Sequence, residues 1–205
     1  MIFGFGVYLT IQANIGVAPW DAFALGLSST FGILYGTASI IVSFTVIALD
    51  LIMREQIGIG TILDAIVVGK TVDLLNWLGL VPKSESLWFS LLLFLVGFLI
   101  MGFSQFLYMK SGLSCGPRDA MLVGLNRRIN KIPIGALNTC ILAVVLVIGW
   151  FLGGPVGIGS IIAPFGIGLM QQLAFNILKF EPRKVKHQNI ISSCRVILGI
   201  NKSGK

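Results

Sequence analysis

Three ionisable side chains in one long apolar stretch are the residues of this sequence best placed for chemistry. Asp64, Lys70 and Asp73 all lie between residues 58 and 80. A charged group inside a bilayer costs roughly 2.5–3.5 kcal/mol on insertion scales, so each requires a partner or a wet cavity. Lys70 and Asp73 are spaced to share one helix face, which predicts a structural ion pair. Asp64 has no such neighbour, and we interpret it either as a cation or proton site or as a structural group.

A second pair of carboxylates lies in a turn that the sequence repeats. Residues 19–22 (Pro-Trp-Asp-Ala) recur 98 residues later at 117–120 (Pro-Arg-Asp-Ala). Asp21 and Asp119 have two interpretations. Each could cap the start of a short helix. Alternatively, the two short helices point into the bilayer from opposite faces, and the carboxylates join a substrate site there. Trp20 is either an interfacial aromatic anchor or a surface on which a ligand stacks.

The repeat extends beyond this turn. The Gly-Ile-Gly at 58–60 recurs at 157–159, and Gly36 recurs as Gly135, with a spacing of 99 residues. Internal duplication in a hydrophobic chain is typical of transporter folds, whose sites lie where the two copies meet.

The elements that must position these residues are apolar helices. A spanning helix needs about 20 apolar residues, and this length predicts five spans, at 36–53, 58–80, 87–109, 134–153 and 157–178. The apolar stretch 1–14 is short for a span, and we expect a truncated first span, with a natural half-helix as the alternative. Short helices opened by proline are predicted at 19–30 and 117–129.

The predicted fold class is therefore all-α membrane: six transmembrane helices form two inverted-topology three-helix repeats, each with a short helix after its first span. Three spans per repeat is an odd number, so the second copy enters the bilayer from the opposite side. The predicted divisions are membrane repeat 1 at 1–81, an outside loop at 82–86, membrane repeat 2 at 87–180 and a basic cytoplasmic tail at 181–205.

Composition supports a membrane location. The chain is 56% hydrophobic and only 11% charged, against roughly 25% charged residues in a soluble domain. With a cytoplasmic N-terminus, thirteen of the fifteen Lys and Arg residues lie inside, Lys83 lies outside and Lys70 lies in a span. This positive-inside pattern predicts that both termini are cytoplasmic. The net charge of +7 then fits loops beside anionic lipid, and no nucleic-acid partner is expected.

No motif for catalysis, a cofactor or a metal is recognisable. Cys115, Cys140 and Cys194 lack the spacing of a metal site or a disulfide framework, and the single histidine, His187, lies in the basic tail. Nucleophile, phosphate-loop and zinc signatures are missing from the sequence. We therefore expect a protein that is not an enzyme and has no catalytic residues.

The turn and the glycines that follow it resemble a known family. Residues 16–21 (Gly-Val-Ala-Pro-Trp-Asp), Gly26, Gly36, the Gly-Ile-Gly-Thr at 58–61 and Asp64 are similar to the YczE/YitT-like family of bacterial integral membrane proteins. The resemblance covers about residues 1–180. It implies a multi-pass protein of the bacterial inner membrane, and it implies no substrate.

Two functions remain open from the sequence. The first is transport or channelling of a small solute or ion through a site formed by Asp21, Asp119 and Asp64. The second is a non-transporting accessory or assembly factor of another membrane system, in which the charged residues only hold helices together. The expected partners are the lipid bilayer, an unknown solute or ion, and either a second copy of the chain or another membrane protein.

Overall fold

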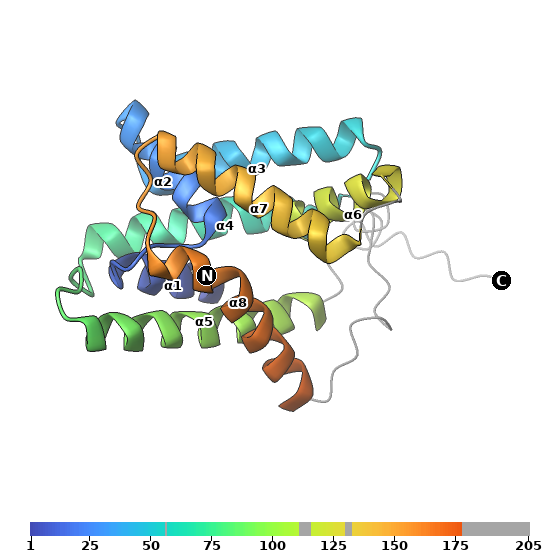
Figure 1. Cartoon of the computed structure of the whole chain (residues 1–205). Coiled ribbons are helices and arrows are strands. Elements are labelled where there is room, and N and C mark those ends of the chain that lie inside the picture. The colour runs from blue at the N-terminus through green and yellow to red at the C-terminus, as the bar shows by residue number, and fades with distance from the viewer. Residues whose placement is uncertain (56, 111–115, 130–132, 178–205) are drawn as a thin grey trace, which may run out of the picture.

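The computed structural model describes residues 1–55, 57–110, 116–129 and 133–177, so the predicted tail at 181–205 lies outside the described residues. The described chain is all-helical (Figure 1). Its helices are α1 (Ile2–Gln12), α2 (Pro19–Phe31), α3 (Tyr35–Ile52), α4 (Ile59–Leu78), α5 (Leu87–Lys110), α6 (Pro117–Ile129), α7 (Ile134–Phe151) and α8 (Ile158–Ile177). These bounds follow the predicted ranges closely.

Local sequence explains where the short helix α2 begins and ends. Pro19 occupies its first turn, where the missing N–H costs no hydrogen bond. Gly32 ends the helix in the left-handed region, with φ of 63°, which a residue without Cβ adopts at little cost. In the second half, α6 also begins at a proline, Pro117.

The order of helices recurs in the two halves of the chain. The short helices α2 and α6 each have 13 residues, α3 and α7 each have 18, and α4 and α8 each have 20. The packing recurs as well, because α2 packs against α7 as α3 packs against α6, and α1 packs against α4 as α5 packs against α8. Helix α1 also packs against α5, so it lies between α4 and α5 (Figure 1). The inverted orientation of the two halves in a bilayer stays a prediction.

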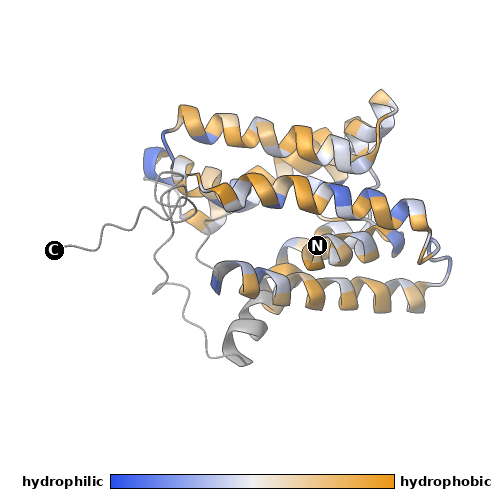
Figure 2. Cartoon of the chain, turned by 180° about the vertical axis from the view of Figure 1, so that it is seen from behind, coloured by the Kyte–Doolittle hydropathy of each residue, from blue (hydrophilic) through white to orange (hydrophobic). Residues whose placement is uncertain are grey.

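Three of the described helices are long and apolar enough to cross a membrane: α3, the Leu87–Tyr108 part of α5, and α7. Helix α4 has 20 residues but includes the charged residues Asp64, Lys70 and Asp73. Large apolar side chains such as Trp88 and Phe151 face outward, and hydrophobic residues cover much of the long helices (Figure 2). An outer surface of this kind suits lipid. Six spans remain the predicted number.

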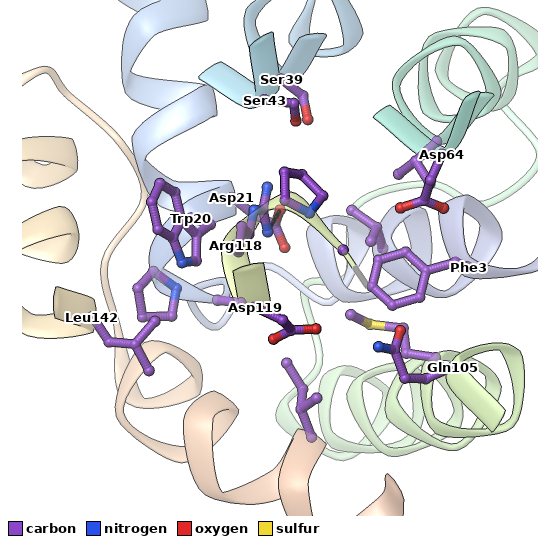
Figure 3. Close-up of a pocket in the computed structure, with 18 of the residues that line it drawn as sticks. Phe3, Trp20, Asp21, Ser39, Ser43, Asp64, Gln105, Arg118, Asp119 and Leu142 are labelled. Atoms are coloured by element: carbon purple, nitrogen blue, oxygen red, sulfur yellow. Dashed lines mark ion pairs between the residues drawn. The ribbon is translucent and has the colours of Figure 1, made fainter. Parts of the chain in front are cut away.

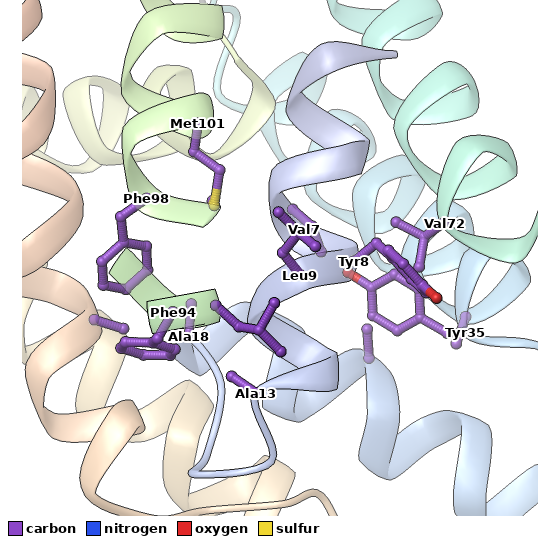
Figure 4. Close-up of a cluster of buried hydrophobic side chains, with 14 residues drawn as sticks. Val7, Tyr8, Leu9, Ala13, Ala18, Tyr35, Val72, Phe94, Phe98 and Met101 are labelled. Atoms are coloured by element: carbon purple, nitrogen blue, oxygen red, sulfur yellow. The ribbon is translucent and has the colours of Figure 1, made fainter. Parts of the chain in front are cut away.

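The core is centred on α1. Val7, Tyr8 and Leu9 are almost fully buried and join a cluster that includes Phe94 and Phe98 of α5 (Figure 4). The Tyr8 hydroxyl donates a hydrogen bond to the Val81 carbonyl at 3.0 Å and accepts one from the Val81 N–H at 2.9 Å. Helix α1 is therefore an internal support for the helices around it.

Glycines allow two of these helix pairs to approach closely. A Cβ on Gly69 of α4 would lie 2.7 Å from the carbonyl oxygen of Gly36 in α3. A Cβ on Gly97 of α5 would lie 2.9 Å from the carbonyl oxygen of Gly6 in α1. Both distances are too short for any side chain, so the backbones pack directly, as small residues permit between membrane helices.

Candidate functional site

A cavity of about 410 Å³ lies where the beginnings of the two short helices meet (Figure 3). Every described helix contributes to its wall. All four residues predicted from the sequence to bind a solute or ion line it, namely Trp20, Asp21, Asp64 and Asp119. The structure thus brings together carboxylates from three helices, although their role in binding stays a prediction.

The repeated turn places its two copies in contact. Trp20 and Arg118 occupy the same position of the recurring Pro-Xaa-Asp-Ala sequence. The Arg118 guanidinium carbon lies 5.1 Å from the centroid of the Trp20 ring. This distance permits a cation–π interaction. Since equivalent positions of the two copies touch each other, the cavity lies at the junction between the two halves of the chain.

Asp21 is the most deeply enclosed carboxylate of the cavity. The Tyr35 hydroxyl donates a hydrogen bond to Asp21 Oδ1 at 2.9 Å, and Arg118 Nη1 lies 4.0 Å from the same oxygen. Burial raises the pKa of Asp21, while the Arg118 charge and the Tyr35 hydrogen bond act in the opposite direction. Asp21 therefore links α2, α3 and α6. It does not cap α2, because the N-cap residue is Ala18 and no side chain makes a capping hydrogen bond there.

Asp119 stands at the equivalent position of the second turn but has different surroundings. Its side chain is open to the cavity, whereas Asp21 is buried. Enclosure by the protein raises the pKa of Asp119, and the charge of Arg118 opposes that effect. The duplicated carboxylates thus differ: Asp21 is bound to its neighbours, and Asp119 faces the cavity.

Asp64 also faces the cavity. It projects from α4 toward the same space as Asp119 and Gln105 (Figure 3). Within the described residues, the ion pairs are Arg118–Asp21 and Arg127–Glu55, so neither Asp64 nor Asp119 belongs to one.

The predicted Lys70–Asp73 ion pair is likewise not among the ion pairs of the described chain. Lys70 is exposed on the surface of α4. Asp73 turns toward the start of α3, where its Oδ1 accepts a hydrogen bond from the Gly36 N–H at 2.7 Å. The first N–H groups of a helix lack partners within that helix, and a carboxylate satisfies one of them favourably. Asp73 therefore fixes the start of a neighbouring helix.

Several groups of the cavity were not assigned to the site from the sequence. Arg118 was counted among the cytoplasmic cations, although its place in the repeated turn is a signal that could have found it. Tyr35, Ser39 and Ser43 also line the cavity, on one side of α3. No sequence pattern marks these as site residues, because only packing turns that face of α3 toward α2 and α6.

Comparisons with known proteins find bacterial relatives of this chain. A family described as "Family of unknown function (DUF6198)" matches residues 1–176. The uncharacterized membrane protein YczE of Bacillus subtilis is 30% identical over 172 residues, which are 83% of this chain and 79% of that protein. An uncharacterized protein of Haemophilus influenzae is 29% identical over 182 residues, covering 88% of this chain and 82% of its own length. No solved structure matches significantly.

Proposed function

The chain belongs to the DUF6198 family of unknown function, and we propose that it carries a small solute or ion across a bacterial inner membrane through the cavity between its two halves. Its relatives include a membrane protein named YczE, and its own long helices are apolar. In this proposal the protein moves its ligand without transforming it chemically.

One observation carries the proposal: charged groups gather in a cavity inside a bundle of apolar helices. Asp64 and Asp119 face about 410 Å³ of space without an ion-pair partner in the described chain. Ionisable groups at membrane depth are costly and commonly mark the path of a substrate or ion. If these carboxylates only held helices together, pairing each with a cationic side chain would cost less free energy than leaving it without an ion-pair partner.

The duplication of the chain supports the same function. In inverted-repeat transporters, helices that do not cross the whole membrane begin near its middle and direct their N-termini at the ligand. The first residues of α2 and α6, which belong to opposite halves of the chain, line the cavity. We infer six spans in two inverted repeats with both termini cytoplasmic, an orientation favoured by the positive-inside distribution of Lys and Arg.

The test is a flux measurement on the full chain in proteoliposomes. Wild-type protein and Asp64→Asn are screened against small ions and metabolites by uptake or by transport currents. Glu85→Gln is the matched control, because it removes the same charge from an exposed residue outside the cavity. We expect flux in wild type and Glu85→Gln and at least a tenfold loss in Asp64→Asn. Equal flux in all three proteins would remove Asp64 from the pathway.

The alternative of an accessory factor makes a different prediction. Arg127 and Arg128 expose a basic surface at the end of α6, although Arg127 pairs with Glu55 at 3.3 Å and Arg128 donates to the Met53 carbonyl at 2.9 Å. An accessory factor should lose its cellular role when Arg127 and Arg128 become Gln and keep it in Asp64→Asn. A transporter should show the reverse.

A further inference from the structure

We propose that the cavity takes a small organic cation, an ammonium or guanidinium group on a short apolar body, with Asp64 and Asp119 as its counter-charges. This inference deepens the transport function proposed above and rests on it. It concerns the class of ligand, which neither the family nor the relatives indicate.

The charges of the wall favour a cation. Three carboxylates and one guanidinium line the cavity, and the guanidinium of Arg118 is paired with Asp21. Asp119 lies in the first turn of α6, where the partial positive charge of the helix start offsets it by about half a charge. Asp64 has no such compensation from the start of α4. A bound cation would neutralise this excess, whereas an anion would increase the repulsion.

One corner of the cavity already binds a group of this chemistry. The Arg118 guanidinium lies 5.1 Å from the Trp20 ring centroid and 4.0 Å from Asp21 Oδ1, so an aromatic face and a carboxylate together hold an organic cation of the chain itself. Asp64 and Asp119 are the other two carboxylates of the cavity, and neither belongs to an ion pair of the described chain. The ligand position we assign is the space between them (Figure 3).

The size and the remaining wall favour an organic molecule over a bare ion. A volume of about 410 Å³ lies within the range of about 300–1,000 Å³ typical of small-molecule sites. Phe3, Met101 and Leu142 supply apolar surface to the cavity, and the Gln105 side chain adds an amide to its wall. Figure 3 shows Gln105 with Asp64 and Asp119 around this space. The short aliphatic body of the ligand would contact these apolar side chains, and its charged end would stay near the carboxylates.

The experiment compares ligands of matched shape on purified full-length protein in nanodiscs. The cationic probes are butylammonium, methylguanidinium and tetramethylammonium, and the neutral and anionic controls are butanol and butyrate. Binding is read by thermal unfolding and by calorimetry. We expect at least one cation to bind and to raise the melting temperature, with neither control doing so.

Variants then assign the binding to the cavity. Asp64→Asn and Asp119→Asn should each lower the affinity for the cation by about tenfold or more. Glu85→Gln should leave that affinity unchanged. Two independent variants are used so that poor folding of one leaves the other as a test, and circular dichroism verifies the helical content of each. Failure of all three cations to bind, tighter binding of butyrate, or unchanged affinity in both variants would overturn the inference.

Flux measurements separate this inference from the transport function. A cation that binds in a manner dependent on Asp64 but is never carried into proteoliposomes would overturn transport and sustain the ligand class. An anion carried by the protein, with no binding of any cationic probe, would overturn the ligand class and sustain transport.

Discussion

At the scale of single residues, the difference between Asp21 and Asp119 is the most informative feature of the site. The sequence places both in the same repeated turn. The structure joins Asp21 to Tyr35 and Arg118 and leaves Asp119 open to the cavity. The two copies of the motif thus differ: Asp21 is in an ion pair, and Asp119 is in none of the ion pairs of the described chain, because Arg118 approaches only Asp21 closely enough to pair.

Tyr35→Phe should destabilise the protein by about 1–3 kcal/mol, because it leaves buried Asp21 without its hydroxyl donor. The measurement is chemical or thermal unfolding in detergent. Asp21→Asn and the double variant complete a double-mutant cycle. Since the two side chains are hydrogen-bonded, the double variant should cost less than the sum of the single ones. Strict additivity would show that the bond contributes nothing to stability.

Affinity for a cationic probe should fall as the pH is lowered. Enclosure by the surrounding protein raises the pKa of Asp119 from its usual 3.8, with the Arg118 charge acting in the opposite direction, so this carboxylate takes up a proton at a higher pH than an aspartate in free solution does. Below its raised pKa the neutral form offers a cation no counter-charge, and above it the charged form does. Butylammonium keeps its own charge throughout, since amines titrate near pH 10.4. Calorimetry at a series of pH values above and below the raised pKa should show that the affinity for butylammonium depends less on pH in Asp119→Asn than in wild type. The same pH dependence in both proteins would contradict the role of Asp119.

At the scale of helices, close backbone approach holds the first half together. The α3–α4 contact is made by Gly36 and Gly69, and Asp73 of α4 binds the Gly36 N–H at the same place. The apolar spacing predicted both helices but not this contact. The Lys70–Asp73 pair was inferred from positions within one helix, whereas the neighbouring helix offered Asp73 an unsatisfied N–H.

Gly69→Ala should destabilise the protein by about 1–3 kcal/mol, because the new Cβ would lie 2.7 Å from the Gly36 carbonyl oxygen and force the two backbones apart. Gly135→Ala is the matched control, since a Cβ there meets nothing within 4 Å and alanine favours a helix. Unfolding in detergent should show that Gly69→Ala is less stable than wild type and that Gly135→Ala is at least as stable as wild type. Equal stability of the two variants would argue against tight α3–α4 packing.

At the scale of the whole molecule, the two halves repeat each other in helix order and in packing partners. Their contact through Trp20 and Arg118 puts the cavity at the junction. If the two halves are inverted in the membrane, defined loops must lie on opposite sides of it, and this can be tested directly.

Single cysteines at positions 83 and 127, in a chain whose native cysteines are replaced by serine, should label from opposite sides of the membrane. With both termini cytoplasmic, Lys83→Cys should react with a membrane-impermeant maleimide on intact cells, and Arg127→Cys should react only after permeabilisation. The positive-inside distribution is the physical reason for this orientation. Labelling of both cysteines from the same side would refute the proposed topology.

The sequence by itself determined the class of the protein, the helix positions and the set of carboxylates at issue. The signals behind these predictions are local in the sequence. They are apolar stretches about as long as a bilayer is thick, prolines at helix starts and a repeated turn. They led to the helices that the structure shows, and to Asp21, Asp64 and Asp119 as candidates.

Only the tertiary structure decided how those candidates are used. It brought Arg118 from the second half onto Trp20 and Asp21 of the first, turned Tyr35 toward Asp21 and directed Asp73 to Gly36. These contacts join residues of different helices. Periodicity along one helix fixes which side chains share a face, but the face that meets a given partner depends on how whole helices pack, and that is a property of the assembled bundle.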